Sequence, residues 1–240
     1  MGTAIAEYYA KGRAAKLRVF SSQFYEDEIP VNTLLRTLDD MPPQEQEALR
    51  LCRGRVLDVG AGSGCHSLEL MNRGLEVVAI DISTLSVDVM RQRGIDARVA
   101  DFFDKTFDEK FDTILMAMNG IGIVGRIERL PEFFMRLKQI LAPGGQVLLD
   151  SSDIRYVFEH EDADFPAFLL DVWHTMTAAI REGLTHTGIL PGGLEVERKA
   201  QRLYNQRHID ESANTRENRL VCAYAFAVSE QNADCGTIVT

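Results

Sequence analysis

Residues 55–150 alternate short apolar runs with segments of helical periodicity. Continuous apolar runs between turn residues are typical of strands buried on both faces, and apolar residues recurring every three or four positions indicate amphipathic helices. Such an alternation predicts an α/β fold with a doubly wound, mostly parallel sheet covered on both faces. The expected strands are 56–59, 76–80, 97–100, 111–116 and 146–150, and the expected helices are 65–73, 83–93 and 130–141.

The N-terminal segment, residues 1–54, lacks this alternation. Residues 1–30 are polar and irregular, and no regular element is expected there. Apolar spacing over residues 31–40 predicts a short amphipathic helix, and residues 44–51 a second one, with Pro43 near its first turn. We assign residues 1–54 to a helical segment that precedes the first core strand, a position suited to a lid.

The C-terminal third of the chain also loses the alternation. Residues 165–184 and 195–207 have the pattern of helices, and the second of these is highly charged. The apolar, alanine-rich run over residues 220–230 is expected to form a buried helix, with a strand as the alternative. We therefore expect a core over residues 55–160 and a helical tail over residues 165–240. The final strands of the sheet are either complete or missing in this arrangement.

Composition narrows the function classes. The chain has 240 residues and a formal net charge of −10, so no nucleic-acid partner is expected, because phosphate binding requires clustered Lys and Arg. No signal peptide is evident, and no stretch approaches the roughly 20 apolar residues that span a bilayer. Cys52, Cys65, Cys222 and Cys235 are scattered without a CxxC pair, which favours a cytoplasmic protein with reduced thiols and no membrane partner.

Gly60, Gly62 and Gly64 form a GxGxG turn between the first core strand and the following helix. Glycine lets the backbone turn sharply and lets a ligand approach main-chain N–H groups without a Cβ in the way. Dinucleotide enzymes have GxGxxG spacing around a diphosphate. The spacing here favours a ligand with a carboxylate at the helix N-terminus. Ser63 and His66 are expected to cap this helix or to face solvent.

Acidic residues stand at the ends of three predicted strands: Asp58, Asp81 and Asp101. Open α/β sheets bind ligands at the carboxyl ends of their strands. A carboxylate such as Asp81 can accept hydrogen bonds from both hydroxyls of a ribose. Asp101 precedes Phe102, and an acid beside an aromatic ring can bind an adenine amino group and cover the base. A core position explains Phe102 equally well.

Four segments in order, residues 56–64, 78–81, 100–102 and 111–115, resemble the successive motifs of class I S-adenosylmethionine-dependent methyltransferases. The resemblance covers residues 28–160 and implies a Rossmann-like fold with S-adenosylmethionine as the cofactor. It implies that the glycines contact the methionine part, that Asp58 lies near its amino group, and that the later acids bind ribose and adenine. The cofactor-binding residues implied are Asp58, Gly60, Ala61, Gly62, Gly64, Asp81, Ile82, Asp101 and Phe102.

The sequence names no catalytic base and no metal ligand. Asn119 follows the fourth strand, where amino-group methyltransferases often carry Asn-Pro-Pro-Tyr, and it is the one candidate for orienting an acceptor. A flexible loop explains Asn119 and Gly120 equally well. Methyl transfer is an in-line displacement on a sulfonium that depends chiefly on positioning, so a missing base does not contradict the resemblance.

The tail has a resemblance of its own. Four segments, residues 172–176, 183–185, 188–193 and 223–233, resemble part of the catalytic region of iron–sulfur L-serine dehydratases, and the resemblance covers residues 165–240. Two cysteines in the tail are too few to hold a four-iron cluster, and we assign no cluster ligand. The hypothesis is a methyltransferase core fused to a dehydratase fragment, with an unusual helical tail as the alternative.

Together these features predict a cytoplasmic S-adenosylmethionine-dependent methyltransferase that acts on an unidentified small-molecule acceptor. One alternative is an S-adenosylmethionine-binding module without activity. Another is a fusion that carries a non-functional L-serine dehydratase fragment.

Overall fold

The computed structural model describes residues 1–19, 27–152 and 221–227 of the chain. The chain divides into two compact units. The first contains Met1–Phe107 and Thr113–Met116, and the second contains Asp108–Asp112 and Ala117–Thr240.

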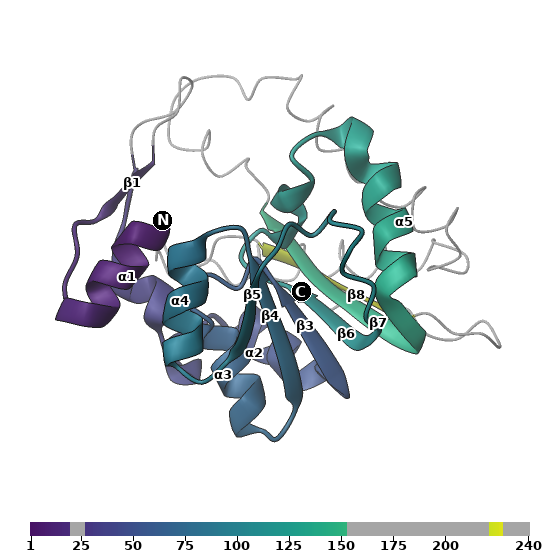
Figure 1. Cartoon of the computed structure of the whole chain (residues 1–240), viewed down its shortest axis with the longest axis horizontal. Coiled ribbons are helices and arrows are strands. Elements are labelled where there is room, and N and C mark those ends of the chain that lie inside the picture. The colour runs from purple at the N-terminus through teal and green to yellow at the C-terminus, as the bar shows by residue number, and fades with distance from the viewer. Residues whose placement is uncertain (20–26, 153–220, 228–240) are drawn as a thin grey trace, which may run out of the picture. The chain divides into compact units, whose positions relative to one another are not determined.

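The first unit is organised around parallel strands that lie side by side in the order β5-β4-β3-β6 (Figure 1). From β3 the chain adds β4 and β5 on one side and then returns to add β6 on the other. The carboxyl end of β3 is therefore where the direction of strand addition reverses, which is where open α/β sheets bind ligands. The strands are β3 (Arg55–Val59), β4 (Glu76–Asp81), β5 (Asp96–Val99) and β6 (Phe111–Met116).

Two helices connect the first three of these strands. α3 (Cys65–Asn72) joins β3 to β4, and α4 (Thr84–Gln92) joins β4 to β5. The Ser83 side chain accepts a hydrogen bond from the Ser86 N–H at 3.3 Å and so caps α4. The parallel strands and their helical connections confirm the predicted Rossmann-like α/β class. A buried apolar cluster packs α4 against the sheet. It consists of Ala61, Ala79, Val87, Met90, Ile95 and Ala97.

The N-terminal residues are more regular than the sequence predicts. α1 (Gly2–Lys11) is followed by an antiparallel pair, β1 (Leu17–Val19) and β2 (Asp27–Ile29), so the expectation of no regular element over residues 1–30 is wrong. α1 lies alongside α4 (Figure 1), where the fully buried Ile5 packs with Leu34 and Val89. Ile5 is the one large apolar residue of α1 that is fully buried, and a single such residue gives no periodic pattern in the sequence. Tertiary packing stabilises a helix of this kind.

The next residues form two 3₁₀ helices, η1 (Val31–Leu35) and η2 (Leu38–Asp40), so the prediction of one amphipathic helix over residues 31–40 is wrong. Arg36 interrupts it with an extended backbone, at φ −65° and ψ 160°. Thr37 Oγ1 then donates to Asp40 Oδ2 at 2.9 Å, a local side-chain bond of the kind that competes with helix continuation. α2 (Pro43–Leu51) confirms the second predicted helix. We call residues 31–45 the cap segment.

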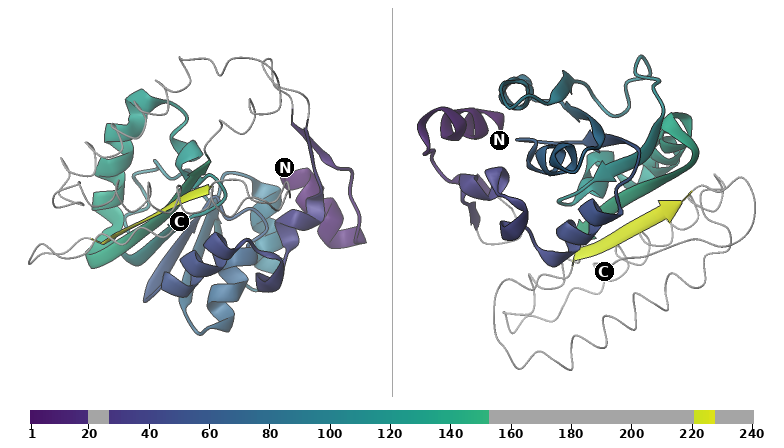
Figure 2. Two further views of the ribbon diagram at one scale, coloured as in Figure 1. Left: turned by 180° about the vertical axis from the view of Figure 1, so that it is seen from behind. Right: turned by 90° about the horizontal axis from the view of Figure 1, so that it is seen from below.

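The second unit contains η3 (Gly120–Val124), η4 (Ile127–Arg129), α5 (Leu130–Ile140) and β7 (Leu141–Ser152). On α5, Phe133, Phe134 and Leu137 are fully buried. β8 (Val221–Ala227) runs antiparallel to β7, opposite residues 146–152 (Figure 2).

β8 corrects the expectation for the apolar run near the C-terminus. The helix expected over residues 220–230 is wrong within the described part, and the strand alternative is correct. Alanine favours helices, but alternation of small and larger residues suits a paired strand. The helices predicted over residues 165–184 and 195–207 lie outside the described residues. In the described part of the chain, no helix is long and apolar enough to cross a membrane.

Candidate cofactor-binding site

The glycine turn, Gly60 to Gly64, joins the carboxyl end of β3 to α3. The N–H groups of Gly60 and Ala61 donate to the carbonyl oxygen of Ile80 at 2.9 and 3.1 Å, which fastens the turn to the end of β4. φ is 69° at Gly60, 58° at Gly62 and 77° at Gly64. Residues with a Cβ are strained in this conformation, which explains the glycine at each of these positions.

Two glycines of the turn have different surroundings. A Cβ at Gly64 would overlap the Ile95 side chain and lie 3.0 Å from Met90 Cγ, so Gly64 is required for close packing against the core. A Cβ at Gly62 would meet nothing among the described residues closer than the Gly60 carbonyl oxygen, at 4.0 Å. Gly62 therefore leaves open space beside the turn.

Asp81 ends β4 and is bonded directly to the glycine turn. Its Oδ2 accepts the N–H of Gly62 at 2.9 Å, and its Oδ1 accepts the N–H of Ser83 at 2.8 Å. The carboxylate thus holds the turn and the loop before α4 in fixed positions. Each carboxylate oxygen can accept a second hydrogen bond, so Asp81 retains the capacity that a ribose contact requires.

Asp58 lies within β3, two residues before the glycine turn, and is only 2% exposed. The Ser67 hydroxyl donates to its Oδ2 at 2.6 Å. Burial raises the pKa of Asp58; the charge of His66 and the hydrogen bonds from Ser67 oppose this rise, and the like charge of Asp81 adds to it. The position therefore disfavours the ionised form of the Asp58 carboxyl.

The residues expected at the adenine differ in exposure. Ile82 is 75% exposed. Asp101 is also exposed, and its Oδ1 accepts the N–H of Phe103 at 2.8 Å. Phe102 is 2% exposed and packs edge-on against Phe103, with ring centroids 5.4 Å apart. The structure therefore supports the core alternative for Phe102.

Val99 is a further candidate that the sequence did not single out. It ends β5 opposite Asp81 in the parallel register and is 47% exposed. The N–H of Ala100 donates to the Asp81 carbonyl oxygen at 3.1 Å. The end of β5, and with it Asp101, is therefore held beside Asp81. An apolar residue left exposed at the carboxyl end of a strand is a signal that only the structure provides.

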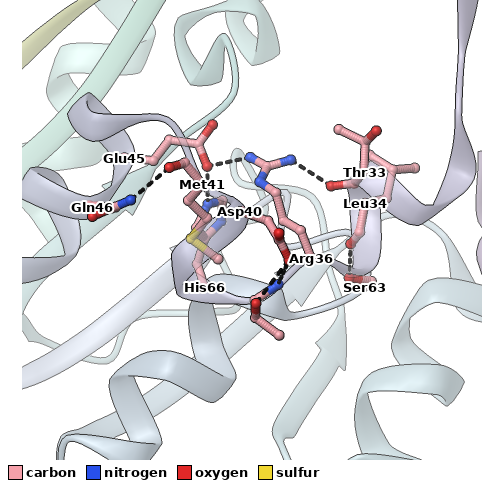
Figure 3. A network of polar contacts seen from close by, with 10 residues as sticks. Thr33, Leu34, Arg36, Asp40, Met41, Glu45, Gln46, Ser63 and His66 are labelled. Atoms are coloured by element: carbon pink, nitrogen blue, oxygen red, sulfur yellow. Dashed lines mark hydrogen bonds and ion pairs between the residues drawn. The ribbon is translucent and has the colours of Figure 1, made fainter.

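Sequence reasoning also missed a buried polar cluster of Arg36, Glu45 and His66 (Figure 3). Arg36 Nη2 donates to Glu45 Oε2, and His66 Nε2 lies 2.9 Å from the same oxygen. None of these residues is more than 9% exposed, so the expectation that His66 caps α3 or faces solvent is wrong. Arg36 and Glu45 are 9 positions apart in the chain, and Glu45 and His66 are 21 positions apart. The periodicity of a single helix or strand therefore does not reveal this cluster.

Comparisons with known proteins agree with this geometry. A family model described as a methyltransferase domain matches residues 56–145. A solved S-adenosylmethionine-dependent methyltransferase from Bacteroides fragilis, in complex with S-adenosyl-L-homocysteine, is 56% identical to this chain. The match covers 70% of each chain with a TM-score of 0.65. The chain belongs to the class I S-adenosylmethionine-dependent methyltransferases. This family membership confirms the predicted enzyme class and cofactor.

Curated relatives of this methyltransferase fall into two groups. The cypemycin N-terminal methyltransferase of a Streptomyces species is 35% identical over 102 residues, which cover 41% of this chain and 42% of that protein. The L-serine dehydratase of Streptomyces coelicolor is 38% identical over 72 residues, 30% of this chain and 16% of that protein. The chain thus spans less than half of each relative, and both predicted resemblances are confirmed.

In this methyltransferase Asn119 lies in the second unit, at the start of η3. Met118 and Asn119 both have positive φ, at 61° and 66°, a left-handed conformation that asparagine adopts readily and that strains methionine by about 1–2 kcal/mol. The N–H of Gly120 donates to Asp150 Oδ1 at 2.9 Å and holds the loop after β6. Because such strain concentrates at functional sites, Asn119 stays the candidate for orienting an acceptor.

Proposed function

We propose that this methyltransferase binds S-adenosylmethionine at the carboxyl ends of β3, β4 and β5 and transfers its methyl group to a small-molecule acceptor. The observation that carries the proposal is the Asp81 carboxylate, which is bonded to the Gly62 N–H at the point where the strand order reverses. A potential ribose-binding acid is thereby fixed against a turn that leaves space for a ligand.

The residues at this edge fit the cofactor. Gly62 leaves room for the methionine part near the N-terminus of α3, where N–H groups and the helix dipole favour a carboxylate. Asp81 has the free acceptor capacity for the ribose hydroxyls. Ile82 and Val99 supply exposed apolar surface for the adenine, and Asp101 supplies an acceptor for its amino group.

Two buried residues are assigned indirect roles. Asp58 is too buried for broad contact with a ligand. We therefore propose that its carboxylate attracts the cofactor's ammonium group indirectly, through the turn or through a bridging water. Phe102 supports the loop after β5 from the core. It is therefore proposed to shape the adenine site without covering the base.

S-adenosylmethionine supplies an electrophilic methyl group on a positively charged sulfur. The residues of the chain bind and orient the two reactants, and positioning alone can contribute several orders of magnitude in rate. We assign acceptor orientation to Asn119. With no base assigned, the acceptor itself supplies a nucleophilic atom.

The acceptor is proposed to be a small molecule. A formal net charge of −10 is unfavourable for a polyanionic partner. We place the reaction in the cytoplasm, because Cys52 and Cys65 are free and buried and the cysteines show no disulfide pattern.

Calorimetric titration with S-adenosylmethionine and S-adenosyl-L-homocysteine tests binding, and Asp81→Asn tests the site. Charge-assisted hydrogen bonds contribute about 1.5–3 kcal/mol, so Asp81→Asn should weaken binding about 10- to 100-fold. Asp96→Asn is the matched control, since Asp96 is exposed at the opposite end of β5 and paired with Arg98. Absence of wild-type binding at millimolar cofactor would overturn the proposal.

Transfer of a labelled methyl group into a pool of metabolites then separates an enzyme from a binding module without activity. Binding without any labelled product would favour the module. The matches to L-serine dehydratases support one other reading of the tail, as a non-functional fragment of such an enzyme. Iron content and visible absorbance after anaerobic purification test that reading.

A further inference from the structure

The buried polar cluster joins the cap segment to the helix that follows the glycine turn. Arg36 Nη1 donates to the Thr33 carbonyl oxygen at 2.6 Å, while its Nη2 donates to Glu45 (Figure 3). His66, the second residue of α3, meets the same Glu45 oxygen at 2.9 Å. One carboxylate oxygen therefore connects the end of η1 with α2 and α3.

A second contact ties the same segment to the glycine turn itself. The Ser63 hydroxyl, between Gly62 and Gly64, donates to the Leu34 carbonyl oxygen. Arg93 Nη1 donates to the Ser63 carbonyl oxygen at 2.5 Å from the other side. The turn is thus held between the cap segment and the end of α4. Movement of the cap segment would change the surroundings of the proposed cofactor site.

Glu45 is the acceptor on which this arrangement depends. Burial alone would raise the pKa of Glu45, but the hydrogen bonds and charges of His66 and Arg36 together lower it, so the carboxylate is ionised at neutral pH. Arg36 Nε is buried without a hydrogen-bond partner among the described residues. Without the Glu45 charge, the buried guanidinium would lose its counter-ion, an arrangement that strongly disfavours the closed packing.

We propose that Glu45 is a positioning residue for the cofactor site: by binding Arg36 and His66 together, it keeps the cap segment closed on the glycine turn and sets the affinity for S-adenosylmethionine. This inference rests on the proposed function. Glu45 acts through the cap segment and makes no contact with the reacting atoms.

The test compares Glu45→Gln with Glu47→Gln, the same substitution two residues later on α2 in an exposed pair with Arg50. Hydrogen–deuterium exchange of the ligand-free proteins reports cap closure. Calorimetry with S-adenosyl-L-homocysteine reports affinity. Because apparent affinity scales with the closed fraction, a cap closed about a tenth of the time binds about tenfold more weakly.

For Glu45→Gln we expect faster exchange in residues 31–45 with unchanged exchange in β3 and β4, and about a tenfold loss of affinity. KM for the cofactor should rise while kcat at saturating cofactor stays unchanged, the pattern of lost binding rather than lost chemistry. Glu47→Gln should change neither quantity. Glu45→Asp, which restores the charge, should recover part of the affinity.

Wild-type affinity in Glu45→Gln would overturn the inference, and so would lost affinity with unchanged exchange in the cap segment. If Glu45→Gln does not fold, His66→Ala carries the same test, because it leaves the Arg36–Glu45 pair in place. Failure of the wild type to bind S-adenosyl-L-homocysteine or S-adenosylmethionine would overturn the proposed function instead. The exchange measurement would still test whether Glu45 closes the cap segment.

Discussion

At the scale of single residues, Asp58 places a carboxylate where the protein environment disfavours its charge. Its pKa in the folded protein is raised above the ordinary value of 3.8, chiefly by burial. A folded-state pKa above the unfolded one means that the folded protein holds the proton more tightly, so ionisation lowers stability. Such a penalty is typical of sites at which function is favoured over stability.

Asp58→Asn should therefore make the fold more stable at neutral pH and bind the cofactor more weakly. In a domain of this size, each 1 kcal/mol of stability gained raises Tm by about 2–4 °C. The gain should be constant above the folded pKa and should shrink as pH falls toward 3.8. Thermal denaturation over a pH series measures it, with Asp96→Asn as the exposed control. A lower Tm for Asp58→Asn at neutral pH would contradict the interpretation.

At the scale of elements, two glycines of the same turn have different roles: one allows close packing in the core, and the other leaves space for a ligand. Gly64 lies against Ile95 and Met90, whereas Gly62 borders open space. Both have positive φ, so alanine at either position carries backbone strain of about 1–2 kcal/mol. Only the alanine at Gly64 also overlaps core side chains.

Gly64→Ala should consequently destabilise the fold by about 2–5 kcal/mol, as strain and overpacking add. Gly62→Ala should cost about 1–2 kcal/mol of stability but weaken binding of S-adenosyl-L-homocysteine, since its Cβ enters the proposed methionine site. Urea denaturation and calorimetry on both variants measure the two effects. If Gly62→Ala and Gly64→Ala lose the same affinity when both are measured in the folded state, Gly62 has no special relation to the ligand.

Elements whose stabilising contacts are local or repeat regularly were predictable from the sequence. β3, β4 and β6 are mostly apolar segments, the GxGxG turn directly follows β3, and Asp81 is the last residue of β4. α1 and the cap segment were not predictable, because Ile5 packs with Val89 and Glu45 contacts His66, and both contacts join residues far apart in the chain. Phe102 had two equivalent interpretations, and its burial, which the sequence does not reveal, favours a core position.

At the scale of the whole molecule, the chain is similar to two enzyme families. β8 is a strand that the tail contributes. Residues 221–227 pair with residues 146–152 of β7 in the second unit. Residues 221–227, which the proposed boundary at residues 160–165 assigns to the tail, therefore pair with a strand of the proposed core. The fusion hypothesis has to include a tail that contributes a strand.

A chain ending at residue 220 should be less stable than the full chain and should self-associate. β7 would lose its antiparallel partner, and unpaired strand edges promote association. Thermal denaturation and analytical ultracentrifugation measure both effects. A chain ending at residue 227, which keeps β8, is the matched control and should be more stable than the chain ending at residue 220. Equal stability of all three chains would show that β8 is dispensable.

Asp81 has a consequence for anyone who wishes to redesign this protein for a cofactor analogue. The same carboxylate holds the Gly62 N–H and the Ser83 N–H, so replacing it to accommodate an altered sugar would also loosen the backbone around that sugar. Ile82 has the opposite character, with a side chain that is 75% exposed. Variation aimed at bulkier adenosine analogues should therefore begin at Ile82 and keep Asp81 constant.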